Sequence, residues 1–340
     1  MSRMIRFHQF GPAEVLKIEE HPDALPAPGE VQVRVHAIGV SWYDVLWRQN
    51  LASTLARLPA GIGHEMAGVV TAVGDGVDDL AVGDRVASFP AADPNQHPVY
   101  GEVIVMPRNA LTRYPDVLTP AQASVHYTPL LVAYFAYVDL ARIKPGQTVL
   151  ITDASHCAGP CFVQLGKALG AKVIAATKTE DARDYLLGLG ADKVVVTEEQ
   201  DLLMAINKYT DSRGVDVVCD GMGGPQMSLM GDVLAPRGSL ILYGLQGGNQ
   251  TPFPACAAFQ KNIQFYLHCL GNFTGKPQLG IDQDNEALQR ALRDINQLTG
   301  DGVLQPLAIK PFAFEQVAQA HRYMDGCPIG GRAVLELPVT

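Results

Sequence analysis

The spacing of apolar residues changes near residue 125. Before it, short runs alternate between apolar and polar side chains, as in residues 31–36 and 65–74. This alternation is typical of half-exposed strands, and the many Pro and Gly residues between the runs indicate turns. Residues 1–124 are therefore predicted to form a β-rich, barrel-like domain.

Between residues 125 and 268, strand patterns and helix patterns alternate. The expected strands cover residues 148–152, 172–177, 193–196, 215–219 and 239–243, and the expected helices cover residues 129–141, 162–169, 181–189, 201–209 and 226–234. The first of these strands has no polar alternation, so both of its faces should be buried. Strand–helix repeats with short connections predict a parallel, doubly wound sheet of the α/β class.

The last part of the chain has a helical period and then one final strand. Residues 286–298 and 314–324 form amphipathic patterns, and residues 332–337 form a strand pattern. A strand at this place indicates that the chain returns to the first domain. We therefore expect a nucleotide-binding domain of residues 125–268, inserted between residues 1–124 and 269–340 of another domain.

Composition and charge narrow the class of function. Apolar residues make up 47% and charged residues 18% of the chain, as in ordinary globular proteins. The formal charge of −9 argues against a nucleic-acid partner, because negative surfaces repel phosphates. No apolar run reaches the ~18 residues of a membrane span, and residues 1–7 lack the apolar core of a signal peptide. Six cysteines without a CxxC pair fit reduced thiols, so we expect a cytoplasmic protein.

The connection after the first strand of the alternating region is a candidate phosphate-binding turn. Of the glycines in the dinucleotide fingerprint only Gly159 is present, with the small residues Ala154, Ser155 and Ala158 around it. The helix that follows would offer backbone N–H groups and a partial positive charge to a pyrophosphate. The alternative is a doubly wound domain that binds no nucleotide.

The tip of the second strand indicates which dinucleotide would bind. NAD-binding domains place an acid there for the ribose hydroxyls, whereas this strand ends at Thr177 and is followed by Lys178. Lys178 and Arg183 suit the 2′-phosphate of NADPH, and Glu180 lies beyond the strand tip. The alternative is that both cations are solvated surface charges.

Several short motifs are similar to those of the medium-chain dehydrogenase/reductase superfamily. They are Gly-His-Glu at 63–65, Ala-Gly-Val-Val at 67–70, Gly-Asp-Arg-Val at 83–86, residues 144–151, Leu-Gly-Ala-Asp at 189–192 and Gly-Gly-Arg at 330–332. The resemblance implies a GroES-like domain split around a Rossmann domain, with the active site in the cleft between them. The expected NADPH-binding residues are Ser155, Ala158, Gly159, Thr177, Lys178, Arg183, Gly244 and Arg332.

Zinc-dependent members of this superfamily hold their catalytic metal with Cys, His and Cys. At the matching places this chain has Ser41, His64 and Thr128. Hydroxyls are poor zinc ligands at neutral pH, and the cysteine-rich lobe that holds structural zinc is missing between Arg85 and Met106. We therefore expect no metal, although His64 as a ligand is the alternative.

Within the superfamily the chain most resembles the zinc-independent quinone oxidoreductase (zeta-crystallin-like) group, in residues 155–159 and 175–179. That group uses NADPH, which agrees with Lys178. The chain departs from it at Ser41, which replaces an Asn, at Leu46 and Ala52, which replace pocket tyrosines, and at Val132, which replaces a Thr near the nicotinamide. The resemblance thus implies an NADPH-dependent reductase more firmly than a quinone substrate.

Without a metal, hydride transfer needs a conjugated acceptor, such as a quinone or an enone, and hydrogen-bond donors at its oxygen. The candidate catalytic donors are Tyr43, Ser41 and His64, with Tyr43 preferred and packing as its alternative role. His126 and Tyr127 are further candidates, and Asp44 should anchor this corner, with His64 as a candidate partner.

Other functions stay open beside quinone reduction. They are an enone or enoyl (alkene) reductase, a zinc-free alcohol dehydrogenase-like enzyme, and a crystallin-like NADPH-binding protein with little turnover. The β-prone run 264–269 would form a sheet edge, which predicts a homodimer because uncovered edges tend to associate.

Overall fold

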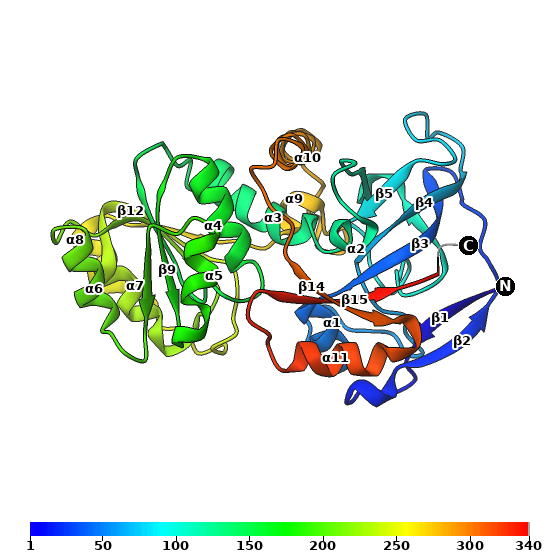
Figure 1. Ribbon diagram of the computed structural model, residues 1–340, viewed down its shortest axis with the longest axis horizontal. Coiled ribbons are helices and arrows are strands. Elements are labelled where there is room, and N and C mark those ends of the chain that lie inside the picture. The colour runs from blue at the N-terminus through cyan, green and yellow to red at the C-terminus, as the bar shows by residue number, and fades with distance from the viewer. Residues whose placement is uncertain (339–340) are drawn as a thin grey trace. The chain divides into compact units, whose positions relative to one another are not determined.

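The computed structural model describes residues 1–338, and the chain divides into two compact units (Figure 1). The β-rich unit comprises Met1–Thr128, Phe273–Gly300 and Pro306–Thr340, and the parallel-sheet unit comprises Pro129–Asn272 and Asp301–Gln305. The expected boundaries, after residues 124 and 268, fall a few residues before these divisions. The short segment 301–305 belongs with the parallel-sheet unit, which the sequence analysis did not anticipate.

The β-rich unit is built on a 7-stranded sheet in the order β14-β15-β3-β4-β5-β7, with β6 paired to β3. The strands of this sheet are β3 (Glu30–Val40), β4 (Glu65–Val73), β5 (Arg85–Ser88), β6 (Val103–Pro107), β7 (Leu111–Arg113), β14 (Ala308–Ala313) and β15 (Gly331–Glu336). β1 (Ser2–Arg6) and β2 (Lys17–His21) form a separate antiparallel pair. Its helices are α1 (Trp42–Arg48), α2 (Pro120–Ala123), α10 (Asn285–Gly300) and α11 (Val317–Asp325), and α9 (Gly271–Thr274) lies where the chain re-enters the unit.

The final strand confirms that the chain returns to its first part. β15 pairs antiparallel with β3, so that Ala333 faces Val40 and Leu335 faces Ile38. β15 also pairs in parallel with β14. The sequence analysis missed β14, because its residues Ala308–Ala313 include Lys310 and Pro311 and are mostly exposed, so they carry no apolar alternation.

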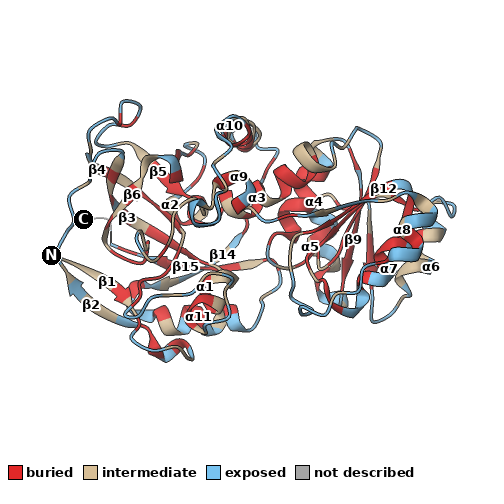
Figure 2. Ribbon diagram, turned by 180° about the vertical axis from the view of Figure 1, so that it is seen from behind, coloured by how far each residue is buried: buried red, intermediate tan, exposed pale blue. Residues whose placement is uncertain are grey.

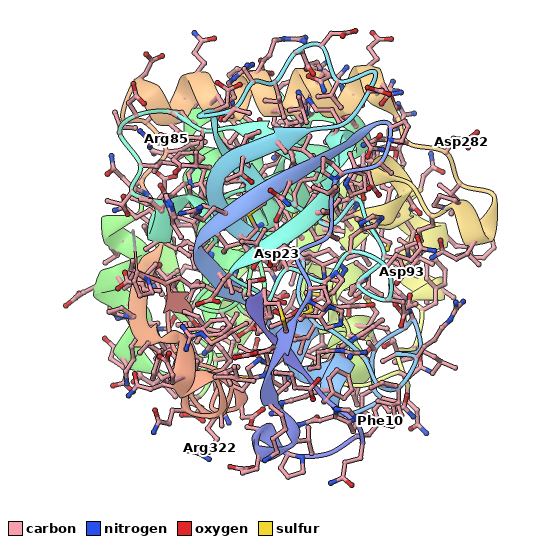
Figure 3. All side chains as sticks on the ribbon, turned by 90° about the vertical axis from the view of Figure 1, so that its right-hand side faces the viewer. Phe10, Asp23, Arg85, Asp93, Asp282 and Arg322 are labelled. Atoms are coloured by element: carbon pink, nitrogen blue, oxygen red, sulfur yellow. The ribbon has the colours of Figure 1, made fainter. Side chains whose placement is uncertain are left out.

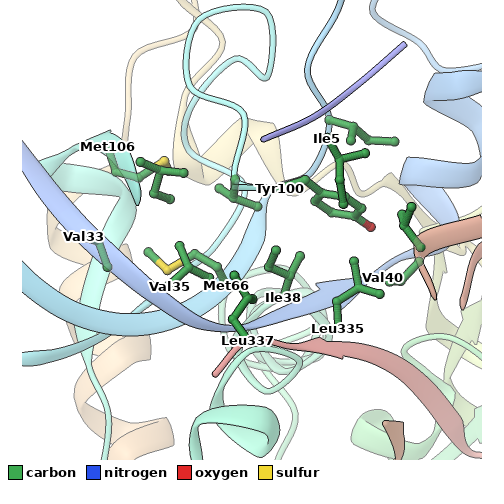
Figure 4. Packing of buried hydrophobic residues seen from close by; sticks show 14 of the residues in the cluster. Ile5, Val33, Val35, Ile38, Val40, Met66, Tyr100, Met106, Leu335 and Leu337 are labelled. Carbon is green, nitrogen blue, oxygen red and sulfur yellow. The ribbon is translucent and has the colours of Figure 1, made fainter. Parts of the chain in front are cut away.

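The core of the β-rich unit fills the space between this sheet, α1 and α11. Figure 4 shows Ile5, Ile38, Met66 and Leu335 packed together, all of them fully buried. Tyr100 is buried in the same cluster and brings a hydroxyl into it. Charged side chains stand at the surface (Figure 3), among them Arg85, which pairs with Asp116 at 2.9 Å.

The parallel-sheet unit is a doubly wound sheet in the order β10-β9-β8-β11-β12-β13, and every pairing in it is parallel. Its strands are β8 (Thr148–Ile151), β9 (Lys172–Thr177), β10 (Lys193–Val196), β11 (Val215–Asp220), β12 (Leu234–Leu242) and β13 (Gln264–Leu267). Its helices are α3 (Tyr127–Tyr134), α4 (Gly159–Ala168), α5 (Arg183–Gly188), α6 (Leu202–Tyr209), α7 (Met227–Val233) and α8 (Ala255–Lys261). Helices α4 and α5 cover one face of the sheet and α6, α7 and α8 the other (Figure 1).

Burial follows this layering. Figure 2 shows buried residues along β9 and β12 and exposed residues on the outer helices α7 and α8. All four residues of β8 are buried, as the lack of polar alternation predicts. By contrast, β13 at the end of the sheet is exposed at three of its four residues. Within residues 1–338 the longest apolar helix is too short to cross a membrane.

Some expected elements differ from the observed ones at their ends. The helix expected at 129–141 is α3 followed by a π-helical stretch, Phe135–Leu140, in which Ala141 N–H bonds to the Ala136 carbonyl at 2.9 Å. The strand expected at 148–152 ends at Ile151, although Thr152 N–H still donates to the Cys219 carbonyl at 3.0 Å. The helix expected at 181–189 begins at Arg183, after a 3₁₀ turn.

Candidate active site

In the β-rich unit, the corner between β3 and α1 is fixed by a reciprocal cap. The Ser41 hydroxyl accepts from Asp44 N–H at 3.2 Å, and the Asp44 carboxylate accepts from Ser41 N–H at 2.8 Å. This capping box satisfies two N–H groups at the start of the helix. Ser41 therefore has a structural role here, and its hydroxyl proton remains a possible donor to a substrate.

Asp44 is buried and has Tyr100, rather than the expected His64, as its side-chain partner. The Tyr100 hydroxyl donates to Asp44 Oδ2 at 3.1 Å. Burial raises the pKa of Asp44 to about 7, and the nearby charge of Glu65 adds to the rise. Asp44 therefore anchors the corner as expected, through its hydrogen bonds with Ser41 and with the core residue Tyr100.

Tyr43 and His64 lie side by side at this corner. Their rings meet edge to face with centroids 5.1 Å apart, and both side chains are partly exposed. Burial raises the pKa of Tyr43, so its hydroxyl keeps its proton at neutral pH. Loss of hydration lowers the pKa of His64 to about 4, which Asp93 (Figure 3) opposes only in part, so His64 is neutral. The pair thus offers two uncharged N–H and O–H donors.

Two other expected donors are already bonded to α10. His126 Nε2 lies 2.8 Å from the Thr299 hydroxyl, whose own proton goes to the Ile295 carbonyl at 2.7 Å, so the imidazole is the donor. The Tyr127 hydroxyl donates to Asn296 at 2.6 Å. Both side chains are buried, and they hold α10 to the rest of the β-rich unit.

Arg332 is likewise bonded inside the β-rich unit. Its guanidinium pairs with the buried carboxylate of Glu65 and donates to the Val40 carbonyl at 3.3 Å. Only 8% of the Arg332 side chain is exposed. These contacts give Arg332 a structural role within the β-rich unit.

The residues at the expected metal positions do not form a thiolate site. Ser41 caps α1, and the Thr128 hydroxyl is buried without a hydrogen-bond partner within the described chain. Across residues 1–338, no three His, Cys, Asp or Glu side chains come together as metal ligands would.

In the parallel-sheet unit, the turn from β8 to α4 is packed against the neighbouring strands. Ala154 N–H bonds to the Ala176 carbonyl at 2.9 Å, and the buried Ser155 hydroxyl lies 3.0 Å from that of Thr177. Ala158 is buried and precedes the first turn of α4. The backbone path of this turn is therefore held by the packing of Ser155, Ala158 and Thr177.

Two glycines let backbone segments approach closely at the same end of the sheet. A Cβ at Gly159 would lie 2.5 Å from the Ala154 carbonyl oxygen, and one at Gly244 would lie 2.3 Å from the Gly221 carbonyl oxygen. A side chain at either position would displace the backbone that forms the turn. The turn that these backbone segments form at Gly159 and Gly244, here called the cradle, fits a pyrophosphate together with the start of the ten-residue helix α4.

The same turn carries a hydrogen-bonded pair of side chains that the sequence analysis missed. His156 Nδ1 lies 2.7 Å from Asp153 Oδ1 and 3.0 Å from the Ser155 hydroxyl. The signal in the sequence is the presence of polar side chains where the fingerprint has glycines.

The cations at the tip of β9 are surrounded by acids. Lys178 lies 3.8 Å from Glu198, and Arg183 bonds to Glu180 and lies 3.9 Å from Glu199. The Lys178 side chain is 77% exposed. The two cations expected to bind a 2′-phosphate are therefore paired with three carboxylates, which would compete with a ligand for them.

Comparison with known families gives two matches on this chain. Residues 27–116 match the alcohol dehydrogenase GroES-like domain, and residues 158–289 match the zinc-binding dehydrogenase domain. The first match lies in the β-rich unit, and the second lies mostly in the parallel-sheet unit.

Curated relatives align over nearly the whole chain. A mycocerosic acid synthase-like polyketide synthase of Mycobacterium tuberculosis is 30% identical over 96% of this chain, but the chain spans only 15% of that protein. The synaptic vesicle membrane protein VAT-1 homolog of Rattus norvegicus is 28% identical over 93% of this chain and 79% of its own length.

Solved structures align along their full length. A quinone oxidoreductase of Pseudomonas syringae pv. Tomato DC3000 is 29% identical with a TM-score of 0.85, and the Escherichia coli quinone oxidoreductase solved with NADPH is 27% identical with a TM-score of 0.85; both cover 99% of this chain and 100% of their own. A 2-haloacrylate reductase is 25% identical with a TM-score of 0.84 and full coverage of both chains. The two domain matches and these full-length alignments establish that the chain belongs to the medium-chain dehydrogenase/reductase superfamily, in its quinone oxidoreductase group.

Proposed function

We propose that this protein is a zinc-independent oxidoreductase that uses NADPH to reduce a quinone or another conjugated acceptor. The observation that carries the proposal is the full-length alignment with quinone oxidoreductases, one of them solved with NADPH. The cradle at Gly159 and Gly244 fits the cofactor pyrophosphate, and Lys178 and Arg183 fit its 2′-phosphate. Ser155, Ala158 and Thr177 hold the turn in shape.

When bound, NADPH supplies the hydride. Reduction of a quinone to a hydroquinone adds that hydride and one proton, and negative charge develops on the carbonyl oxygen in between. Tyr43 and His64 are uncharged donors, which can stabilise this oxygen without a metal. Ser41 adds a second hydroxyl at the same corner.

Zinc independence follows from the donor chemistry at the metal positions. The Ser41 oxygen accepts a backbone hydrogen bond as a helix cap, and Thr128 offers a hydroxyl where a zinc enzyme has a thiolate. His64 would then be the sole remaining ligand of the zinc set. Oxidation of simple alcohols needs a metal to stabilise the alkoxide, so reduction of conjugated acceptors fits this donor set better.

A second candidate is reduction of an activated alkene. The likeness to the 2-haloacrylate reductase favours it, because that protein is named for an alkene conjugated to a carboxylate. The same donors would serve the oxygen of an enone. The proposed acceptor is therefore a conjugated one, and the assay distinguishes a quinone from an alkene.

The test is NADPH oxidation with 1,4-benzoquinone, 9,10-phenanthrenequinone and 2-alkenals, beside NADP⁺ reduction with ethanol and benzyl alcohol. Turnover of a quinone or an alkenal is the expected result, and rapid alcohol oxidation in metal-free buffer would contradict the mechanism. Tyr43→Phe should lower turnover by about 10²-fold while leaving NADPH affinity unchanged. An unchanged rate would leave Tyr43 as a packing residue.

We also propose that the protein is a cytoplasmic homodimer. The outer strand β13 exposes Leu267 at 68% and Phe265 at 37%, and Phe259 on α8 is 90% exposed. An uncovered strand edge with apolar side chains favours pairing with a second copy. The sequence has six cysteines and no CxxC pair, which fits a reducing compartment.

A further inference from the structure

Tyr100 is a core residue whose backbone joins two other segments of the β-rich unit. Its carbonyl accepts from Ile5 N–H at 2.8 Å, and its own N–H donates to the Ile62 carbonyl at 3.2 Å. The side chain is fully buried within the core packing that Figure 4 shows. Packing alone does not require a hydroxyl here, because a buried polar group stabilises a core only where it finds a hydrogen-bond partner.

The partner of this hydroxyl is the carboxylate that caps α1. The Tyr100 hydroxyl donates to Asp44 Oδ2 at 3.1 Å, and the same oxygen accepts from Ser41 N–H at 2.8 Å. The other oxygen, Asp44 Oδ1, is buried and has no hydrogen-bond partner within the described chain. Tyr43 stands between Ser41 and Asp44, in the first turn of α1. The Tyr100 hydroxyl therefore holds the turn that carries the first of the two donors.

The ring of Tyr100 lies against the residue that precedes the second donor. A Cβ at Gly63 would lie 2.3 Å from Cδ1 and 2.4 Å from Cε1 of the Tyr100 ring. Gly63 also has φ 97°, in the left-handed region that favours glycine. The backbone immediately before His64 therefore packs directly on this ring, with no side chain between them.

The same ring is also connected to the last residue of α1. His321 on α11 meets the Tyr100 ring edge to face, with centroids 5.8 Å apart. His321 Nδ1 accepts from Arg48 Nε at 3.2 Å, and Arg48 ends α1. Helix α1 is thus linked to Tyr100 at both of its ends, at the first through Asp44 and at the last through His321.

We propose that Tyr100 is a positioning residue that sets the place of Tyr43 relative to His64. Its ring packs on the backbone before His64, and its hydroxyl ties the turn that carries Tyr43 to that ring. The rings of Tyr43 and His64 then meet with centroids 5.1 Å apart. This proposal rests on the proposed reduction, in which both donors serve the oxygen of the acceptor.

Such a role acts on turnover rather than on binding. Hydrogen-bond donors accelerate a reaction when they fit the charge that develops in the transition state, so a displaced donor lowers kcat more than it raises KM. The affinity for NADPH should not change, because the cradle at Gly159 and Gly244 belongs to the parallel-sheet unit.

The test is a double-mutant cycle on kcat, with the acceptor that the parent protein reduces fastest. Tyr100→Phe keeps the ring on Gly63 and removes the hydroxyl, so it should lower kcat by about tenfold and change KM and the Kd of NADPH by less than about twofold. In a Tyr43→Phe background, Tyr100→Phe should lower kcat by less than about twofold, because the donor that it positions is already lost. A general defect in folding would instead lower kcat by the same factor in both backgrounds.

Tyr114→Phe is the matched control. Tyr114 is another buried tyrosine of the β-rich unit, and its hydroxyl has no hydrogen-bond partner within the described chain. Removing that hydroxyl should leave kcat and KM unchanged. Urea unfolding of each variant confirms that the protein is folded under the conditions of the assay.

The outcomes distinguish this proposal from the one it rests on. An active parent protein whose kcat is unchanged by Tyr100→Phe, or is lowered equally in the Tyr43→Phe background, would overturn the positioning role and leave the reduction intact. A parent protein that reduces neither a quinone nor an alkenal would contradict the proposed function itself.

Discussion

Glu180 is the residue that we expect to limit the affinity of this protein for a 2′-phosphate. Its carboxylate bonds to Arg183, and this hydrogen bond lowers the pKa of Glu180, so the carboxylate is charged at neutral pH. Glu199 lies 3.9 Å from the same guanidinium. A bound 2′-phosphate must therefore take Arg183 from an existing partner.

Glu180→Gln removes the competing charge and keeps the size of the side chain. Both members of the pair are partly exposed, at 27% for Arg183 and 53% for Glu180, so the pair itself is weak. Releasing Arg183 from an exposed pair should tighten binding of a 2′-phosphate by about two- to fivefold. Lys178→Ala should act in the opposite direction, by about tenfold or more, because it removes a cation from the strand tip.

The assay is calorimetric titration with 2′,5′-ADP and with 5′-AMP, which differ in the 2′-phosphate. Glu180→Gln should tighten 2′,5′-ADP alone, and the gain should shrink when Arg183→Ala is added. Glu14→Gln is the matched control, since Glu14 is an exposed glutamate bonded to an arginine, Arg322, in the other unit. Equal or weaker 2′,5′-ADP binding by Glu180→Gln would refute the assignment of Arg183 to the 2′-phosphate.

Three further predictions concern metal, assembly and pH. Purified protein should contain no stoichiometric zinc and keep its activity in EDTA, because Ser41 and Thr128 offer hydroxyls in place of thiolates; about one zinc per chain, lost together with activity, would contradict this. Light scattering should give twice the chain mass, and Leu267→Lys on the exposed β13 edge should reduce it to one, whereas a monomeric parent would exclude the dimer. The urea midpoint should fall from pH 7 to pH 5, because the pKa of His126 is lowered to about 4 and that of His321 to about 3, so the unfolded chain binds more protons below its histidine pKa of ~6.5. Each histidine contributes ~1.4 kcal/mol per pH unit to this loss of stability. The carboxyl of Asp44, with its pKa of about 7, changes stability in the opposite direction and offsets one of the two histidines. A midpoint that does not fall would show that these histidines are not buried in their neutral form.

The sequence by itself determined the architecture of the parallel-sheet unit. β9 and β10 have the expected bounds, 172–177 and 193–196, and the other strands of the alternation differ only at their ends. Such elements can be predicted because a strand buried on both faces must be apolar throughout, and that requirement is visible in a few adjacent residues. The position of Lys178 directly after the last residue of β9 can be predicted from the same local pattern.

Only the tertiary structure determines which residues far apart in the chain form hydrogen bonds and ion pairs with one another. Arg332 was expected at the cofactor, yet it pairs with Glu65, 267 positions away, and His126 bonds to Thr299, 173 positions away. The sequence alone does not distinguish an arginine or a histidine that contacts a ligand from one that bonds to a buried side chain. Which partner it takes depends on where the packed strands and helices bring the second group, and on the cost of leaving a polar group buried without a partner.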